Sequence, residues 1–524
     1  MTPPRTSTKP FPAACLAALA ILPLAARPLA AADRKATPAA VQQWVRAHEI
    51  AILHEFAGLL AIPNLARDGP NIRRNAEHIA ALLGRRGLTT RLLDGEGGPP
   101  AVYGERSSTG ATRTIVVYAH YDGQPVTEAD WATPPWTPTL RDGPLEAGGR
   151  EIALDGLPGP PSGDWLLYGR SAGDDKAPII ALVAALDALS ALQVAPSVNL
   201  KVFFEGEEEA GSPHLRAVLE KNKDLLKADA WLLCDGPVHQ SRRPLVFFGV
   251  RGIADLELTL YGPARALHSG HYGNWAGNPA VELAHLVAGL RDPNGRIRIP
   301  GFYDDVRPPT PAEGEALRDF PDLDADLRRE LALAATEDGN ARLVERLMLP
   351  ALNVRGLHSG AVGEKAANAI PTEARASIDF RLVPDQRPER VRDLFEAHLR
   401  AQGYAVVHET PSLEERRAQA RLVQLQWKSG YPSARTPLDS SLARAVVDLV
   451  KEATGQAVVR QPTGGGSMPM YLFPEVLGAP ALGLPIANHD DNQHAANENL
   501  RLQNLRDGVA IFATLLAGLG EAWP

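Results

Sequence analysis

The chain has 524 residues, more than one ordinary hydrophobic core accommodates, so we expect two domains. A hydrophobic content of 44% and a charged content of 22% are typical of a globular protein. The formal net charge of -8 and the isoelectric point near 6.0 argue against a nucleic-acid-binding protein, because such proteins carry a basic domain or stripe.

The N-terminus has the composition of an export signal. Arg5 and Lys9 precede the apolar stretch FPAACLAALAILPLAARPLAAAD, which closes in small residues. This order predicts a signal peptide over residues 1–32 and a periplasmic or extracellular protein. The alternative is an uncleaved membrane anchor, but two prolines and an arginine interrupt the stretch before it reaches the roughly 20 apolar residues of a span. We therefore expect no membrane span in the mature chain.

Residues 33–245 alternate apolar strands with helices. The spacing of apolar residues predicts a helix over 40–60, and the run TIVVYAH predicts a buried strand that ends on His120. A helix over 177–192 follows, and then the strands SVNLKVFFEGEEE and DAWLLCDGP, with a helix from Pro213 between them. This alternation predicts an α/β fold, in which helices cover a mainly parallel sheet.

The pattern changes after Pro244. The segment PLVFFGVRGIADLELTLYG alternates polar and apolar residues, as a strand with one exposed face does. A helix over 279–290, the strands ALNVRGL and EARASIDFRLV, the helix PERVRDLFEAHLRAQG and a strand near YAVVHE follow. This is the order of a ferredoxin-like α+β domain, so we predict an inserted domain over 246–432 and the second part of the α/β domain over 433–524. The charged, helical segment 301–350 has no predicted function.

Acidic and histidine side chains follow the predicted strands at the points where these strands end. They are His120, Asp122, Asp174, Asp175, Glu208, Glu209, Asp235, His489 and His494. Each alone has a simpler explanation, such as a solvated charge run, a turn or a helix cap. In an open α/β sheet, however, the carboxyl ends of the strands are where ligands bind. Carboxylates crowded there repel one another unless a cation lies among them, and zinc accepts imidazole nitrogen and carboxylate oxygen.

Six motifs occur in the order found in one peptidase family. They are HYDGQPV, GRSAGDDKAP, EGEEEAGS, HSGHYGN, FRLVP and QHAANENL. With them the chain resembles the M20 family of dinuclear zinc peptidases, and most closely its carnosinase-like dipeptidase branch, over essentially the whole mature chain. The resemblance implies a catalytic α/β domain with an inserted ferredoxin-like lid and dimerisation domain, and therefore a homodimer.

The resemblance also implies a role for each residue of the cluster. The implied metal ligands are His120, Asp174, Glu209, Asp235 and His494. Asp174 would bridge two divalent ions, with zinc expected first and manganese or cobalt as alternatives. Asp122 would orient the ring of His120, Glu208 would act as the general base, and the peptide bond after Asp174 would be cis. His489, Asp490 and Asp491 remain alternatives to His494 as the metal ligand.

Further residues resemble those that bind the substrate. His268 matches a histidine that helps to polarise the substrate carbonyl. We expect a partner subunit to supply it, and closure of the two domains of one chain is the alternative. Arg381 and the GGGSMP loop with Gly465, Gly466 and Ser467 resemble the groups that hold a free substrate carboxylate. Without the resemblance, Arg381 would be interpreted as a surface charge on a strand.

Together these features predict an exported hydrolase that cleaves the amide bond of dipeptides or short peptides with a free C-terminal carboxylate. Two other reactions fit the same metal centre, namely deacylation of N-acyl amino acids and carboxypeptidase action. A catalytically silent binding protein of the same fold is the alternative from another class. The intact ligand set and Glu208 favour an enzyme.

Overall fold

The computed structural model describes residues 37–523, except residues 96, 158, 340 and 429. The predicted signal peptide lies outside the described residues. Among the helices that the structure describes, none is long and apolar enough to cross a membrane.

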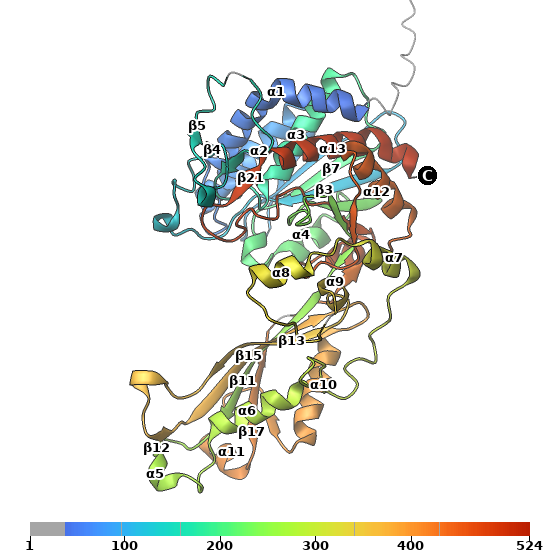
Figure 1. Cartoon of the computed structure of the whole chain (residues 1–524). Coiled ribbons are helices and arrows are strands. Elements are labelled where there is room, and N and C mark those ends of the chain that lie inside the picture. The colour runs from blue at the N-terminus through green and yellow to red at the C-terminus, as the bar shows by residue number, and fades with distance from the viewer. Residues whose placement is uncertain (1–36, 96, 158, 340, 429, 524) are drawn as a thin grey trace, which may run out of the picture.

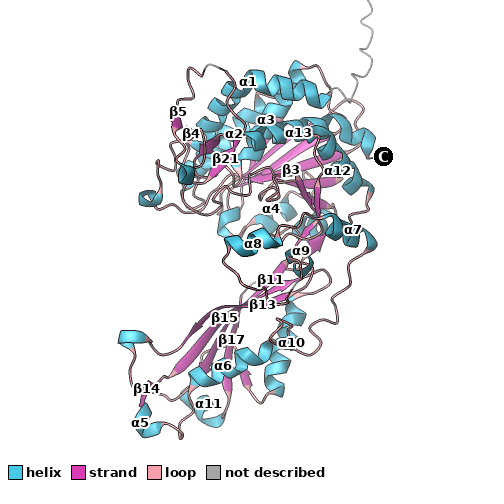
Figure 2. Cartoon of the chain, viewed as in Figure 1, coloured by secondary structure: helices cyan, strands magenta, loops and turns pink. Residues whose placement is uncertain are grey.

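An eight-stranded sheet forms the centre of the larger part of the molecule (Figure 1, Figure 2). Its strands are β1 (Thr89–Leu93), β2 (Ala101–Arg106), β3 (Thr114–His120), β7 (Asn199–Glu205), β8 (Ala230–Leu233), β9 (Leu245–Phe247), β19 (Val459–Gln461) and β20 (Ala481–Gly483). They lie in the order β1-β2-β7-β3-β8-β20-β9-β19. The central strands β7, β3, β8 and β20 are parallel, whereas β1 and β2 are added antiparallel at one edge and β9 pairs antiparallel with β20. The predicted α/β fold with a mainly parallel sheet is confirmed.

Helices cover both faces of this sheet (Figure 1). On one face lie α1 (Thr37–Leu60), α2 (Gly69–Gly84), α3 (Lys176–Ala191), α12 (Ser441–Thr454) and α13 (Leu502–Ala522). On the other face lie α4 (Leu215–Lys221) and a π-helical turn, Phe473–Leu477. Helix α3 is apolar on nearly all sides because it packs between the sheet and the helices α1 and α13.

A second, four-stranded sheet brings together two segments that are distant in the chain. Its strands are β4 (Thr139–Arg141), β5 (Glu151–Ile152), β6 (Leu166–Tyr168) and β21 (Asn499–Arg501), in the order β21-β6-β4-β5. Because β21 pairs with β6, the loop after β6, which carries Asp174, lies next to the loop before β21, which carries His494.

The inserted part folds around its own sheet and its own core. The strands are β11 (Gly252–Tyr261), β13 (Ala351–His358), β15 (Glu373–Leu382), β16 (Ala405–Val407) and β17 (Leu422–Trp427), in the order β13-β15-β11-β17-β16. The helices α6 (Pro279–Leu290) and α10 (Pro388–Ala401) contribute apolar residues to the core over this sheet. The tip carries β12 (Leu267–His268), α5 (Ser269–Tyr272), β14 (Ala369–Ile370) and α11 (Leu413–Ala418).

One strand differs from the sequence prediction. The strand expected near YAVVHE is β16, which lies at the edge and runs parallel to β17. Strand β17 pairs with β11 on the side away from β15, and no predicted strand corresponds to β17. The reason is burial: four consecutive residues of β17 are buried, whereas those of β16 are only partly buried.

The chain passes between the two parts where β10 (Gly249–Val250) pairs with β18 (Ala434–Arg435). Beside this crossing, the segment 301–350 contributes α7 (Pro311–Asp319), α8 (Asp324–Glu330) and α9 (Leu343–Arg346). Figure 1 shows these three helices between the large sheet and the five-stranded sheet.

Candidate metal centre

The candidate site lies at the carboxyl ends of three adjacent parallel strands. Strand β3 ends on His120, which lies opposite Glu205 at the end of β7. The turn after β7 carries Glu208 and Glu209, and Asp235 follows β8. The motifs that end these strands are therefore brought to one edge of the sheet, as the sequence predicted.

His120 contacts two carboxylates from opposite sides of its ring. Its Nε2 lies 2.8 Å from Asp174 Oδ1, and its Nδ1 lies 3.4 Å from Asp122 Oδ1. His120 and Asp122 are fully buried. His120 also offers a ligand atom within 4.8 Å of atoms from Glu208 and Asp235.

The second oxygen of Asp174 faces a different histidine. Asp174 Oδ2 lies 3.1 Å from His494 Nε2, which is also 3.3 Å from Glu209 Oε2. Two glutamine amides support this arrangement, since Gln493 Nε2 donates to Asp174 at 3.0 Å and Gln124 Nε2 donates to Glu209 at 2.6 Å. Asp174 therefore connects the two histidines through its two oxygens, and the peptide bond that follows it is cis.

Burial and mutual repulsion perturb the carboxylates. Burial raises the pKa of Asp235 to about 8, and the nearby charges of Asp174 and Glu208 act in the same direction. Burial likewise raises the pKa of Glu208 and of Glu209 to about 7. Burial acts to raise the pKa of Asp174 too, but the charge of His120 and several hydrogen bonds outweigh it and hold that pKa well below its usual range.

The residues fit a pair of divalent cations. Buried carboxylates at one rim disfavour one another's ionisation, and a cation among them removes that penalty. Imidazole nitrogen and carboxylate oxygen form the donor set that zinc accepts, and manganese and cobalt also take such ligands. The side chains that the structure places here are His120, Asp174, Glu208, Glu209, Asp235 and His494.

Glu498, for which the sequence predicted no role, holds the loop that carries Asp174. Glu498 is fully buried, and its Oε1 accepts hydrogen bonds from the backbone N–H groups of Gly173 and Asp174, both at 2.9 Å. Its Oε2 accepts from the Ser171 N–H at 2.9 Å and from Arg170 Nη1 at 2.8 Å. The sequence feature that could have pointed to Glu498 is its position in the QHAANENL motif, directly before β21.

The predicted carboxylate-binding loop opens into the same space as the cluster. Gly465, Gly466 and Ser467 line a cavity of about 560 Å³ that Asp174, Glu208, Asp235 and His494 also line. Arg381 of β15 donates from Nη1 to Ser467 Oγ at 2.9 Å. Arg381 is therefore directed toward the cavity loop, which a surface charge would not require.

His268 is the one predicted site residue that lies far from the cluster. It is exposed at the junction of β12 and α5, at the end of the inserted part that is remote from the large sheet (Figure 1). Its Nδ1 accepts a hydrogen bond from the N–H of Gly270 at 3.1 Å. This conformation of a single chain does not bring His268 to the metal centre.

Comparisons with known proteins identify one family, related sequences and related folds. A family model described as peptidase family M20/M25/M40 matches residues 116–518. The Cys-Gly metallodipeptidase of Schizosaccharomyces pombe is 28% identical over 85% of this chain and 88% of its own length. The Beta-Ala-His dipeptidase of Mus musculus is 26% identical over 81% of this chain and 80% of its own length. An M20 family metallo-carboxypeptidase from Sulfolobus solfataricus superposes with a TM-score of 0.72 at 27% identity, covering 89% of this chain and 98% of its own. Human carnosine dipeptidase 1 shares the fold, with a TM-score of 0.70 at 23% identity, covering 92% of this chain and 99% of its own.

Proposed function

This chain belongs to the peptidase family M20/M25/M40, and we propose that it is a metal-dependent dipeptidase acting on substrates with a free C-terminal carboxylate. The predicted family and the predicted metallopeptidase class are confirmed. The observation that carries the proposal is one cavity in which the metal-centre carboxylates and the Gly465–Ser467 loop face a common space. Two relatives that match most of this chain are dipeptidases, and this supports the proposed substrate class.

In the proposed centre, two sets of side chains would hold the ions. His120, Asp174 and Asp235 would hold the first, and Asp174, Glu209 and His494 would hold the second. Bound ions would supply the Lewis acidity that makes a water nucleophilic and polarises the amide carbonyl. The contacts of Asp174 and Glu209 are with His494, which favours His494 over His489 as the histidine of the second set.

Glu208 is the proposed general base. It lines the cavity beside Asp174 and Asp235, so its carboxylate can reach a water at the metal centre. Its backbone N–H donates a hydrogen bond to Asp122, which fixes the turn that carries Glu208. A base in this position takes a proton from the attacking water and passes it to the leaving nitrogen.

Arg381 and Ser467 are the proposed partners of the substrate carboxylate. The guanidinium already donates to the Ser467 hydroxyl, and both groups can donate to an anion. A Cβ added to Gly466 would meet no atom within 4 Å, so the backbone there leaves room for a ligand. A carboxylate held at this loop would orient the scissile amide toward the metal centre.

The remote position of His268 supports a homodimer in which each chain completes the other's site. Within one chain His268 lies at the far end of the inserted part. The inserted part also exposes the apolar side chains of Trp275 and Val362, which are 80% and 87% exposed, and contact with a second chain would remove such side chains from water. Export stays a prediction that rests on residues 1–32.

The test is a substrate panel with purified protein from which metal has been removed and then restored. Hydrolysis of dipeptides, and its loss on chelation, would support the proposal. Faster release of C-terminal residues from longer peptides would instead identify a carboxypeptidase, the class of the structurally similar Sulfolobus solfataricus protein. Preference for N-acyl amino acids would identify a deacylase, and metal binding without any hydrolysis would identify a silent binding protein.

A further inference from the structure

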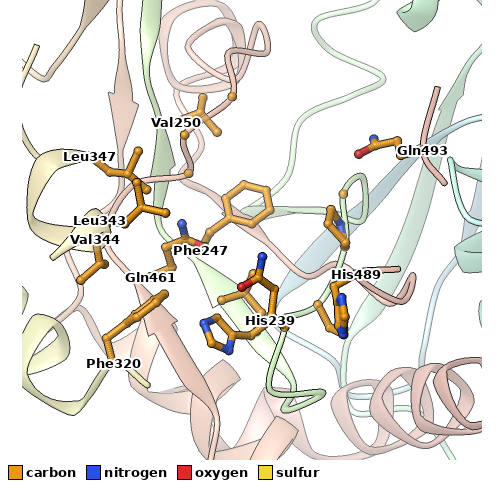
Figure 3. A pocket seen from close by; sticks show the side chains of 18 of the residues that line it. His239, Phe247, Val250, Phe320, Leu343, Val344, Leu347, Gln461, His489 and Gln493 are labelled. Carbon is orange, nitrogen blue, oxygen red and sulfur yellow. The ribbon is translucent and has the colours of Figure 1, made fainter. Parts of the chain in front are cut away.

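Segment 301–350, for which the sequence predicts no function, contributes one wall of the cavity. Its apolar lining residues are Phe320, Leu323, Leu327, Leu343, Val344 and Leu347. Phe320 directly follows α7, and the others come from α8, from α9 and from the residues that flank these two helices. Figure 3 shows Leu343, Val344 and Leu347 together on one side of the cavity, with Gln493 of the metal centre on the opposite side. The cavity therefore has an apolar side and a metal-binding side.

Arginine contacts fix this wall to both parts of the molecule. Arg342 donates to the carbonyls of Leu317 at 2.8 Å and Phe320 at 2.7 Å, which joins α9 to the end of α7. Buried Arg251 donates to the carbonyl of Leu347 at 3.2 Å. Arg460 of β19 donates to Asp319 at 2.7 Å and so attaches α7 to the edge of the large sheet. The wall is thus a supported part of the site.

The apolar side continues onto strands of the catalytic part. Phe247 of β9 and Val250 of β10 line the same cavity, and Phe247 lies between the wall and the metal centre in Figure 3. Leu343 keeps an exposed fraction of 51% while it lines this cavity. A large apolar side chain that faces a cavity among other apolar groups gains free energy when a ligand removes it from water.

The wall adjoins the loop that would hold the substrate carboxylate. A Cβ added to Gly465 would lie 3.2 Å from Leu347 Cδ2, so Leu347 packs directly against this loop. A C-terminal residue whose carboxylate binds at Gly465–Ser467 would carry its side chain next to Leu347. The N-terminal residue lies on the other side of the scissile amide.

From this placement we propose that Leu343, Leu347 and Phe247 form a specificity pocket for a large apolar side chain of the C-terminal substrate residue. This inference rests on the proposed dipeptidase function. Hydrophobic pockets discriminate by about 10–200-fold for each methylene-sized difference. We therefore expect Gly-Leu and Gly-Phe to be hydrolysed at least about 10-fold faster, in kcat/KM, than Gly-Gly or Gly-Asp.

The test uses variants of the wall and a matched control from the same segment. Leu343→Ala and Leu347→Ala should lower kcat/KM for Gly-Leu and Gly-Phe by about 10-fold more than they lower kcat/KM for Gly-Gly. Leu343→Lys should shift the preference toward Gly-Asp and Gly-Glu, an effect that a merely structural role would not produce. Leu333→Ala is the control, because Leu333 is 48% exposed in the same segment and is not among the cavity-lining residues.

Each outcome decides the inference. A selective loss on substrates with C-terminal Leu or Phe supports it. An equal loss on all dipeptides, or a change that follows the N-terminal residue in Leu-Gly and Phe-Gly, overturns it while the dipeptidase proposal stands. If the wild-type protein hydrolyses no dipeptide of the panel, the proposed function fails, and the specificity pocket fails with it.

Discussion

Asp122 Oδ1 accepts a hydrogen bond from the backbone N–H of Glu208 at 3.0 Å. Its Oδ2 accepts one from the N–H of Glu209 at 3.1 Å, and the same carboxylate lies 3.4 Å from His120 Nδ1. One fully buried carboxylate thereby fixes the ends of the two adjacent strands β3 and β7. The residue that was predicted to orient a histidine thus also positions the proposed base and a proposed ligand.

Asp122→Asn should weaken metal binding without removing any proposed ligand. An asparagine amide presents one acceptor oxygen in place of two, so one of the backbone N–H groups at Glu208 or Glu209 loses its partner. Loss of such a supporting partner typically costs 10–100-fold in metal affinity. Competition with a chelator would measure the change, with the exposed Asp130→Asn as the control. Unchanged affinity would contradict the positioning role.

Glu208→Gln and Asp174→Asn should fail in different ways. If Glu208 is the base, its variant keeps both ions and loses about 10²–10⁴-fold in rate. If Asp174 bridges the ions, its variant loses metal as well as activity. Elemental analysis of both variants, together with their turnover, checks this. One potential ligand atom each from Glu208, His120 and Asp235 lie within 4.8 Å of one another. A Glu208→Gln variant that has lost metal would therefore show that Glu208 is a ligand.

Mixing two inactive variants should restore part of the activity if His268 acts across a dimer. His268→Ala and Glu208→Gln each inactivate every site in their own homodimers. In a mixed dimer, one site receives His268 from one chain and Glu208 from the other, so activity should return after subunit exchange. The control is the mixture without exchange. No recovery from dimers shown to be mixed, or full wild-type activity of a monomer, would count against action in trans.

The ionised carboxylate of Glu313 should stabilise the folded protein near neutral pH, and this stabilisation should be lost in acid. Its carboxylate contacts Arg307 Nη2 at 2.8 Å and Arg435 Nη1 at 3.0 Å, and it is nearly fully buried. Burial raises its pKa, but these contacts outweigh burial and lower it to about 2, against an ordinary 4.5. A lowered folded-state pKa contributes stability above the unfolded pKa, and this contribution is lost as the pH falls from about 4.5 to about 2.

Urea unfolding of the wild type and of Glu313→Gln at pH 6 and pH 3 measures this contribution. At pH 6 the wild type should be more stable by on the order of 3 kcal/mol, and at pH 3 by less than half of that. The exposed Glu315→Gln is the control on the same helix. An equal difference at both pH values would show that the charge of Glu313 is not the cause.

Local patterns in the sequence were sufficient for the elements that carry the site. The apolar run of β3 and its abrupt end on His120 predicted a buried strand with a polar terminus, and the structure has both. The helix expected over 279–290 is α6 with the same bounds. Such features depend on residue spacing within one segment, and the order of the six motifs was specific enough to indicate the family.

Non-local pairing and packing decided the rest. The choice of β17 over β16 beside β11 depends on which strand buries more apolar surface against a partner that is distant in the chain, and spacing within a segment does not encode it. The support that Glu498 gives to the Asp174 loop depends on β21 pairing with β6. The distance between His268 and the metal centre, and the apolar wall from segment 301–350, follow from how separate units pack. Burial and contact between distant segments exist only once the chain has folded, so only the tertiary structure could place these residues.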